Sequence, residues 1–278
     1  MDIRMIALDL DGTLTDDNKK ISPYTVEILH QASGKGAKIV LASGRPLLGI
    51  LPVAKEIGLF EMGGMIVAFN GGHIFDCKSG EDIYRAVFPK EYIREVCDFA
   101  KANHVSIISY DSEQIITEGP VDEWVGHEVY NTGAKAKIVP DLPGYIDEIG
   151  YPIVKMLICA DPQALVPIEK ELAQKYEGKL DIYRAEPYFL EVMPKGINKA
   201  AGLRMLMEKT GITREQLMAC GDANNDLPML HEAALSVAVG NASDDVKKHA
   251  AFVSKSNNED GVAYAVKKFV LDGEELEL

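Results

Sequence analysis

The sequence lacks the features of a secreted or membrane-spanning chain. Only four of its 278 residues are cysteines, and Cys77, Cys97, Cys159 and Cys220 show no paired spacing, which indicates neither a disulfide framework nor a zinc site. No segment approaches the roughly 18 uncharged apolar residues of a membrane span. The chain also enters an apolar strand without the basic and apolar segments of a signal peptide. We therefore expect a cytoplasmic protein that does not engage a membrane.

Positive charge is scarce as well. The chain has 29 Lys and Arg against 43 Asp and Glu, a formal net charge of −14, and its longest basic runs are doublets such as Lys247-Lys248. A chain this acidic repels the phosphate backbone, so nucleic acid is not an expected partner. The remaining composition, 47% hydrophobic and 26% charged, is typical of a globular protein with a sizeable core.

Short apolar runs alternate with helical segments at both ends of the chain. In the N-terminal part Met5–Leu8, Lys38–Ala42 and Met65–Phe69 have the pattern of buried strands, and Ser22-Pro23 is a helix start. The C-terminal third repeats this order, with strands expected at Leu217–Cys220, Leu235–Val239 and Phe252–Val253. This alternation predicts an α/β fold with a doubly wound, Rossmann-like parallel sheet. Its ligands should gather beyond the carboxyl ends of the strands.

The middle of the chain has a different pattern. Its strand candidates are longer and less uniformly apolar: Ile83–Phe88, Val105–Ser109, Gln114–Thr117, Val154–Cys159 and Leu180–Arg184. Helices are expected at Glu91–Ala102, Val121–Tyr130 and Pro162–Tyr176. We therefore predict two domains, a catalytic core formed by residues 1–81 and 189–278 and an inserted α+β domain formed by residues 82–188.

Two aspartates follow the first strand. Asp9 and Asp11 are spaced i and i+2, which puts both side chains on one side of an extended backbone, and Gly12 permits a sharp turn directly after them. A calcium-binding EF-hand loop would require a glutamate at its twelfth position, where this chain has Lys20. The pair is therefore a candidate for catalysis or for binding a smaller cation.

Three further segments carry chemistry. Ser43-Gly44 follows a strand and offers a hydroxyl and free backbone N–H groups to phosphate oxygens. Lys199 lies near the start of a predicted helix. A single lysine at such a position is only weak evidence for a functional site. The segment from Asp222 to Asp226 gathers two carboxylates and two amides after a strand, more polar groups than a helix cap requires. That segment indicates a metal or phosphate site.

Taken in this order, the segments resemble the signature of the haloacid dehalogenase superfamily of phosphotransferases. Its motifs DxDGT, a strand-end Ser or Thr, a downstream lysine and GDxxND are all present. The segments ASGRP, YFLEVMPKGINK and SNNEDGVA are similar to the Cof-type branch with a class IIB cap, and especially to its YidA-type sugar phosphatases. The resemblance extends over the whole chain.

The resemblance implies a Mg²⁺-dependent phosphatase that forms an aspartyl-phosphate. Asp9 would be the nucleophile, and Asp11 would protonate the leaving alcohol and then activate water. Mg²⁺ would be held by Asp9, the backbone carbonyl of Asp11 and Asp222, with Asp226 orienting them from behind. The groups expected to bind the phosphoryl oxygens are Ser43, the N–H groups of Leu10 and Gly44, Lys199 and Asn225.

The spacing of the motifs also locates the cap domain that selects the substrate in this superfamily. Only 31 residues separate Asp11 from Ser43, whereas 155 separate Ser43 from Lys199, so the insertion occupies the second cap position. A pocket for the leaving group is expected between cap and core. Its candidate lining residues are Arg45, Asn70, Arg184 and Glu186. The expected partner is a small phosphorylated metabolite, and sugar phosphates are the favoured class of substrate.

Two other functions fit part of this pattern. A phosphorelay receiver domain also phosphorylates an aspartate beside acidic metal ligands, but Asp11 and the inserted middle oppose that interpretation. A phosphomutase of the same superfamily would return the phosphoryl group to a sugar hydroxyl, and the sequence leaves this alternative open. It also leaves open whether the protein is a monomer or a homodimer.

Overall fold

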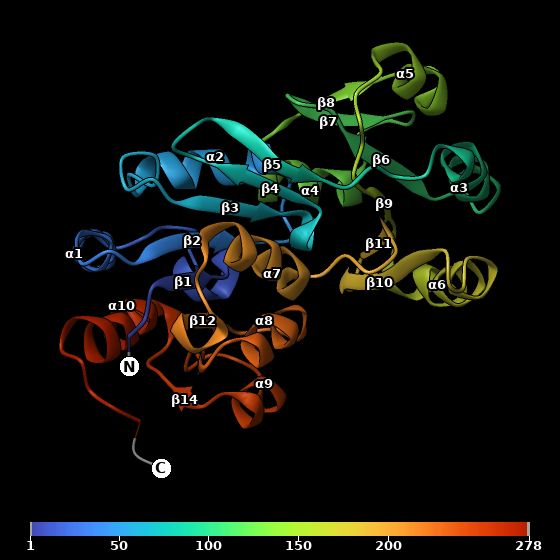
Figure 1. Ribbon diagram of the computed structural model, residues 1–278. Helices are drawn as coiled ribbons and strands as arrows, with labels where there is room; N and C mark the ends of the chain where they lie inside the picture. The colour runs from blue at the N-terminus through green and yellow to red at the C-terminus, as the bar shows by residue number, and fades with distance from the viewer. Residues whose placement is uncertain (1, 277–278) are drawn as a thin grey trace. The chain divides into compact units, whose positions relative to one another are not determined.

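The computed structural model describes residues 2–276 (Figure 1), so positions 1, 277 and 278 of the predicted core lie outside it. The chain divides into two compact units. The first, which we call the core unit, contains the chain up to Gly44, Ile50–Tyr84 and the chain from Asn198 onward. The second, the cap unit, contains Arg45–Gly49 and Arg85–Ile197. This confirms an α/β fold with a second sheet inserted into the core.

The core unit is built on one eight-stranded sheet in the order β14-β13-β12-β1-β2-β3-β4-β5. The strands are β1 Met5–Leu8, β2 Lys38–Ala42, β3 Met65–Ala68, β4 His73–Asp76, β5 Glu81–Arg85, β12 Leu217–Gly221, β13 Leu235–Ala238 and β14 Phe252–Val253. β1 lies in the centre and pairs in parallel with β2 and β12, whereas β3 and β4 are antiparallel. The predicted parallel core is therefore confirmed, with an antiparallel extension at one edge.

Helices flank this sheet. They are α1 Pro23–Gly34, α2 Leu47–Glu56, α7 Lys199–Thr210, α8 Leu227–Glu232, α9 Asp244–His249 and α10 Gly261–Val266. The hydroxyl of Ser22 accepts a hydrogen bond from the N–H of Thr25, which confirms the predicted start of α1. β1 and β12 are buried along their whole length, because helices shield parallel strands on both faces.

The cap unit has a six-stranded sheet in the order β10-β11-β9-β6-β7-β8. The strands are β6 Ser106–Tyr110, β7 Gln114–Thr117, β8 Lys135–Ile138, β9 Met156–Cys159, β10 Leu180–Glu186 and β11 Phe189–Pro194, and the helices are α3 Lys90–Ala102, α4 Glu123–Thr132, α5 Leu142–Ile149 and α6 Pro162–Lys175. One sheet face packs on α3, α5 and α6 through a cluster that includes Val96, Ile146, Leu172, Ile158 and Val192. The predicted α+β insertion is present, with α3, α5 and α6 on one sheet face and α4 in contact with the other.

Three expectations about the middle of the chain differ from the structure. The strand expected at Ile83–Phe88 is shifted to Glu81–Arg85 and forms the edge of the core sheet. β11, which was expected to begin the second core segment, pairs with β9 and β10 in the cap sheet, so the return to the core comes at Asn198 rather than at residue 189. β8 and α5 were not expected; β8 has only four residues and is largely exposed.

Among the described residues, no helix has the length and apolarity to cross a membrane. All four cysteines are buried free thiols, as their scattered spacing predicted.

Gly71 lets the turn after β3 approach the start of α7 closely. Its φ is +105°, and a Cβ there would lie 2.3 Å from the carbonyl oxygen of Asn198. Alanine at a left-handed position costs about 1–2 kcal/mol, and the clash adds to that cost. We therefore expect Gly71→Ala to lower the free energy of unfolding, measured by urea titration, by about 3 kcal/mol or more.

Gly80→Ala is the matched control, because Gly80 has a φ of +73° and nothing lies within 4 Å of its built Cβ. This variant has the backbone strain without the steric clash, so its free energy of unfolding should fall by about 1–2 kcal/mol. Equal losses in the two variants would show that the close approach to α7 does not constrain the turn.

Candidate active site

The sequence motifs lie together at the carboxyl ends of the central strands of the core sheet. Asp9 directly follows β1, Ser43 follows β2, Asn70 lies in the turn after β3 and Asp222 follows β12. These strands are parallel neighbours, so their carboxyl ends lie along the same edge. The structure therefore places these motif residues of the core unit next to one another, at the carboxyl ends of neighbouring strands.

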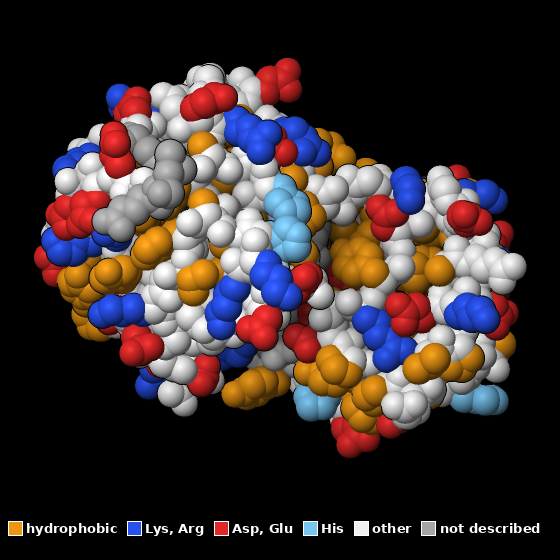
Figure 2. Space-filling model, turned by 90° about the horizontal axis from the view of Figure 1, so that it is seen from below, with side chains coloured by type: hydrophobic (Ala, Val, Ile, Leu, Met, Phe, Trp, Pro, Cys, Tyr) orange, Lys and Arg blue, Asp and Glu red, His pale blue; other side chains and the backbone are white. Residues whose placement is uncertain are grey.

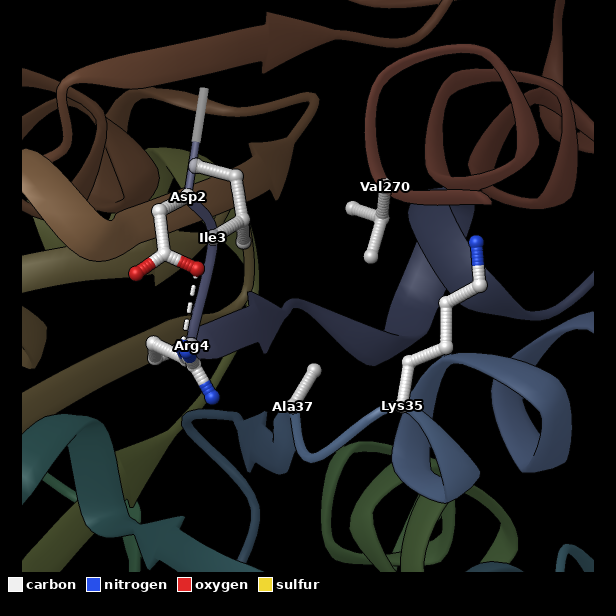
Figure 3. Close-up of a pocket in the computed structure, with 6 residues that line it drawn as sticks. All are labelled: Asp2, Ile3, Arg4, Lys35, Ala37 and Val270. Carbon is white, nitrogen blue, oxygen red and sulfur yellow. Dashed lines mark hydrogen bonds and ion pairs between the residues drawn. The ribbon is translucent and has the colours of Figure 1, made fainter. Parts of the chain in front are cut away.

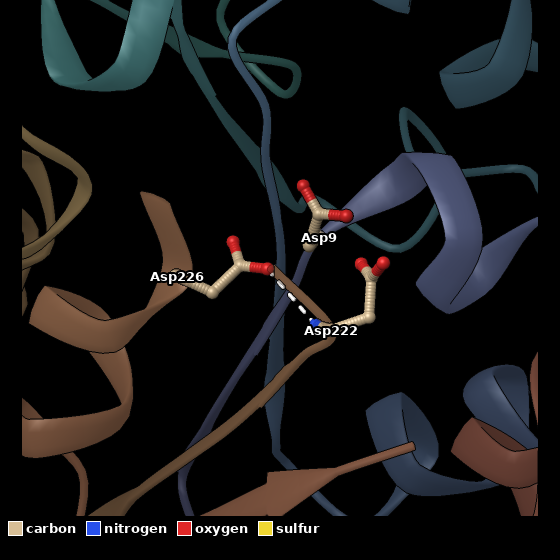
Figure 4. A group of neighbouring side chains, drawn as sticks. All are labelled: Asp9, Asp222 and Asp226. Carbon is tan, nitrogen blue, oxygen red and sulfur yellow. Dashed lines mark hydrogen bonds between the residues drawn. The ribbon is translucent and has the colours of Figure 1, made fainter. Parts of the chain in front are cut away.

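Three carboxylates form the centre of this edge (Figure 4). Oxygens of Asp9, Asp222 and Asp226 all lie within 4.8 Å of one another, close enough to share one metal ion. They come from the end of β1, the end of β12 and a turn of 3₁₀ helix at Asn224–Asp226. Figure 4 shows the Asp226 carboxylate reaching back to the backbone of Asp222, with a hydrogen bond of 3.0 Å from the N–H of Asp222.

The ammonium group of Lys199 contacts two of these carboxylates. Its side chain is fully buried, and Nζ donates hydrogen bonds to Oδ1 of Asp9 at 2.5 Å and to Oδ1 of Asp226 at 2.6 Å. The second oxygen of Asp226 accepts from the N–H groups of Asp222 and Ala223, both at 3.0 Å. Both oxygens of Asp226 are thus engaged in holding Lys199 and the loop after β12, which supports an orienting role for this aspartate.

Burial and the neighbouring charges shift the pKa values of the side chains in this site. Burial, and then the charge of Asp226, raise the pKa of Asp9 well above its ordinary value, although Lys199 opposes them. Burial also raises the pKa of Asp222. Burial alone would lower the pKa of Lys199, but the charges of Asp226 and Asp9 outweigh it and raise it. Three carboxylates against one ammonium leave an excess of negative charge, which a hard divalent cation with oxygen ligands would balance.

Gly12 allows the loop after β1 to fold against Asp222. Its φ is +78°, and a Cβ there would lie 2.7 Å from Oδ2 of Asp222. The next residue, Thr13, donates from its hydroxyl to Oδ1 of Asp222 at 2.7 Å. The loop closes on itself through a hydrogen bond from the N–H of Leu14 to the carbonyl of Asp9. The glycine and threonine of the motif therefore fix the distance between the first and last acidic segments.

Asp11 stands apart from the buried cluster. Its side chain is 36% exposed and forms an ion pair with Nζ of Lys19 at 2.5 Å. Lys19, whose φ is +60°, belongs to the short segment between the motif and α1. Sequence reasoning missed this contact, because a lysine in a polar loop carries no signal of its partner.

Two asparagines outside the motifs brace the same loop. The side-chain amide of Asn241 donates to the carbonyl of Gly12 at 2.7 Å. Its oxygen accepts from the N–H of Asn257, and the amide of Asn257 donates to the carbonyl of Thr15 at 3.1 Å. The SNNEDG segment, which includes Asn257, was noted only as part of the family resemblance. Asn241 was not predicted, and its only signal was a polar residue shortly after a strand.

The proposed phosphate-binding residues are placed as follows. Ser43 is buried, and its carbonyl accepts a hydrogen bond from the N–H of Asn70 at 2.9 Å. A Cβ on Gly44 would lie 3.2 Å from Nδ2 of Asn70, so Asn70 packs directly on the Ser43-Gly44 turn. Leu10 is buried behind Asp9, and Asn225 is exposed in the turn just before Asp226. Binding of phosphate by these residues stays a prediction.

The other candidates belong to the cap unit. Nη1 of Arg45 donates to the carbonyl of Gly49 at 3.3 Å. Arg184 pairs with Glu169 at 2.9 Å, and its Nη1 also donates to the carbonyls of Pro162 and Pro187. Glu186 is exposed at the end of β10. Because the guanidinium of Arg184 is engaged by three groups of its own unit, its local role is to hold the β10–β11 turn against α6.

A cavity of about 160 Å³ lies at the opposite ends of these central core strands, their amino ends (Figure 3). Its lining residues are Asp2, Ile3, Arg4, Lys35, Ala37 and Val270. They lie near the amino ends of β1 and β2, so this cavity is separate from the carboxylate cluster. On the face of the molecule drawn in Figure 2, Lys and Arg are interspersed with Asp and Glu rather than gathered in one basic patch.

The fold and the buried acidic cluster define an α/β protein with aspartates gathered at the carboxyl ends of its parallel strands. A family model described as haloacid dehalogenase-like hydrolase matches residues 6–266, and the chain belongs to this family. It is an enzyme of the phosphatase type, and several of its relatives are named as phosphatases.

Three relatives illustrate this similarity. A haloacid dehalogenase-like hydrolase from Bacteroides thetaiotaomicron is 42% identical, with 96% of this chain and 99% of that chain covered and a TM-score of 0.91. A subclass IIB sugar phosphatase, BT4131, is 28% identical with a TM-score of 0.79, covering 96% and 98% of the two chains. A Bacillus subtilis phosphatase of 5-amino-6-(5-phospho-D-ribitylamino)uracil is 30% identical over 98% of this chain and 97% of its own length.

The burial of Lys199 between carboxylates predicts a large effect on stability. Lys199→Met would leave Asp9 and Asp226 without their buried cation, and breaking a buried pair costs about 3–5 kcal/mol. We expect a loss of this size in the free energy of unfolding, measured by urea titration in EDTA. Lys209→Met, at an exposed position on the same helix, should change it by less than about 0.5 kcal/mol. Similar values for the two variants would mean that Lys199 does not neutralise the cluster.

Proposed function

We propose that this enzyme is a Mg²⁺-dependent phosphatase of small phosphorylated metabolites, foremost sugar phosphates, and that it works through an aspartyl-phosphate on Asp9. The observation that carries the proposal is the convergence of Asp9, Asp222 and Asp226 on the ammonium of Lys199 at the carboxyl ends of the parallel strands. This arrangement holds a carboxylate oxygen at a fixed place, beside a cation and beside ligands for a metal.

The first step forms one bond and breaks one. A carboxylate oxygen of Asp9 attacks phosphorus, the phosphorus–oxygen bond to the alcohol breaks, and Asp11 gives its proton to the leaving oxygen. In the second step Asp11 takes a proton from water, whose oxygen attacks the phosphorus of the aspartyl-phosphate and releases Asp9 and phosphate. The partial exposure of Asp11 supports this role, because its carboxyl group must exchange protons with the leaving alcohol and with water.

The donor set supports magnesium as the metal. Asp9, the carbonyl of Asp11 and Asp222 would hold it, and it would neutralise charge on the phosphoryl oxygens. Asp226, already engaged with Lys199 and two backbone N–H groups, would orient these ligands. Ser43, Gly44, Lys199 and Asn225 would bind the phosphoryl oxygens.

The names of two relatives support an alcohol derived from a sugar. One acts on sugar phosphates, and the other acts on a compound whose phosphate is carried by a D-ribityl chain. In both cases the phosphate ester is part of a polyhydroxylated carbon skeleton. We therefore place sugar phosphates first among the substrates of this chain.

Two aspartate variants separate the proposed steps. Asp11→Asn keeps the nucleophile but cannot donate a proton, so sugar phosphates should not react. With p-nitrophenyl phosphate, whose leaving group needs little protonation, it should release a burst of about one equivalent of nitrophenol. A phosphoenzyme sensitive to hydroxylamine should accumulate at the same time. Asp9→Asn should give neither product, and a burst from this variant would show that Asp9 is not the nucleophile.

The raised pKa values of Asp9 and Asp222 predict how metal binding depends on pH. Without metal, both groups hold protons to higher pH in the folded than in the unfolded chain. Their stabilising contribution is complete below the ordinary aspartate range and is lost as the pH rises through the raised pKa values. Mg²⁺ requires the ionised forms, so the rise in melting temperature that it causes should be larger at about pH 8 than at about pH 5.

The measurement compares melting temperatures in MgCl₂ and in EDTA at each pH. Asp222→Asn should show little rise at either pH, whereas Asp272→Asn, a change in an exposed acidic residue outside the cluster, should behave as the unmodified enzyme. A rise that does not depend on pH, or that persists in Asp222→Asn, would place magnesium elsewhere.

A further inference from the structure

A small closed loop lies between the first motif and α1, and we call its residues 16–20 the rim loop. The N–H of Asp16 donates to the carbonyl of Lys20 at 2.8 Å, and the N–H of Lys19 donates to the carbonyl of Asp16 at 2.9 Å. The carboxylate of Asp16 accepts from the N–H groups of Asn18 and Lys20, both at 2.8 Å. The rim loop therefore has a defined shape, and it belongs entirely to the core unit.

The rim loop is also tied to a distant segment of the core unit. Both oxygens of the Asp17 carboxylate accept hydrogen bonds, from Nδ2 of Asn257 at 3.1 Å and from Nδ2 of Asn258 at 2.9 Å. The N–H of Asp17 donates to Oδ1 of Asn258 at 3.1 Å. Asn257 is buried and also holds the carbonyl of Thr15. These contacts fix the position of the rim loop against the SNNEDG segment.

Lys19 has an unusual backbone conformation within this loop. Its φ is +60°, in the left-handed region that residues other than Gly, Asn and Asp rarely adopt. A lysine at this position carries backbone strain that a glycine would avoid. Such strain persists where the surrounding structure imposes it, and it is concentrated at functional sites. The strain therefore calls for a role of the lysine side chain.

The side chain of Lys19 reaches Asp11. Nζ of Lys19 lies 2.5 Å from Oδ1 of Asp11, although the two side chains are 43% and 36% exposed. Ion pairs at this exposure contribute little to stability, because water solvates both charges and salt screens them. Such a pair does not offset a strained backbone, so stability does not account for a lysine at this position.

The contact restricts the carboxyl group of Asp11. This residue follows Asp9 by two positions, but its carboxylate is not part of the buried cluster of Asp9, Asp222 and Asp226. A group that transfers a proton must lie within hydrogen-bond reach of the reacting oxygen, and a displacement of about 1 Å can lower a rate about a hundredfold. Because Lys19 engages one oxygen of this carboxyl group, it limits the rotation of the side chain.

We propose that Lys19 is a positioning residue for proton transfer by Asp11, and that the rim loop holds its ammonium group in place for this purpose. Lys19 keeps its own protons throughout. The proton that reaches the leaving alcohol comes from Asp11, and Asp11 recovers a proton from water in the second step. This inference rests on the proposed phosphatase function and adds to it a residue outside the four motifs.

Two esters with different leaving groups test this role. Lys19→Met should lower kcat/KM for a hexose 6-phosphate about tenfold to a hundredfold, because its alkoxide leaving group depends on the proton from Asp11. For p-nitrophenyl phosphate, kcat/KM should stay within about twofold, because nitrophenolate leaves without that proton. Lys20→Met, a change at an exposed position of the same loop, should behave as the unmodified enzyme.

A role of Lys19 in binding the phosphoryl group would give a different result. In that case Lys19→Met would lower kcat/KM for both esters by the same factor, since both carry the same phosphoryl group. Equal losses on the two esters, or equal effects of Lys19→Met and Lys20→Met, would overturn the proposal.

A double-mutant cycle shows whether Lys19 acts through Asp11. The measured quantity is the rate of phosphoenzyme hydrolysis after a burst with p-nitrophenyl phosphate. Lys19→Met should slow this step about tenfold or more, because water activation also uses Asp11. Residues that act as a unit give non-additive losses, so adding Lys19→Met to Asp11→Asn should change the rate by less than about twofold. A further tenfold loss in the double variant would contradict the proposal.

Lys19→Gly separates positioning from folding. Glycine removes the side chain and adopts the left-handed conformation without strain. The midpoint of urea unfolding should therefore not fall, whereas kcat/KM for the hexose 6-phosphate should fall as in Lys19→Met. A lower midpoint would assign Lys19 to the fold, and full activity would show that its side chain is not used. Either result would overturn the proposal.

The outcomes distinguish this inference from the function on which it rests. If Asp9→Asn forms no phosphoenzyme and Asp11→Asn accumulates it, but Lys19→Met keeps both kcat/KM and the rate of phosphoenzyme hydrolysis, the positioning role fails and the phosphatase stands. If Asp9→Asn gives the nitrophenol burst, the aspartyl-phosphate mechanism itself fails, whatever the behaviour of the Lys19 variants.

Discussion

The interaction on which the core unit depends is the buried contact of Lys199 with Asp9 and Asp226. It joins the end of β1, the start of α7 and the turn after β12, segments that are up to 217 residues apart in the chain. Two carboxylates cannot remain ionised in a buried place without a cation, and Lys199 supplies it from within the protein. The third carboxylate, Asp222, exceeds what one lysine can balance, and this excess supports the proposed metal site.

The architecture explains why these residues can meet. β1 lies between β2 and β12, and all three run in the same direction, so their carboxyl ends bring Asp9, Ser43 and Asp222 to one edge. Gly12 then lets the loop after β1 approach Asp222 closely, and Asn241 and Asn257 hold that loop from a neighbouring strand end and from the SNNEDG segment. The sheet sets which residues converge, and side-chain hydrogen bonds set how closely they approach.

The sequence predicted the elements whose pattern is local and missed those that depend on distant partners. β1 at Met5–Leu8 and β2 at Lys38–Ala42 have their predicted bounds, because a buried parallel strand is apolar throughout. The motif residues could be located for the same reason, since each follows such a strand. β8, by contrast, is short and largely exposed. Nothing in the sequence of Phe189–Pro194 shows that this strand pairs with β9 rather than with the core sheet. The contacts of Lys19, Asn241 and Glu191 join residues far apart or in loops, so no local pattern contains them.

The balance of charge separates the two buried groups of the molecule. In the core unit Asp9, Asp222 and Asp226 face one ammonium, so the group is negative and calls for a cation. In the cap unit Glu128 and Glu191 are matched by Lys155 and Arg45, so that group has no net charge to neutralise. A balanced set of buried charges calls for no added ion, because a further charge would have no partner there.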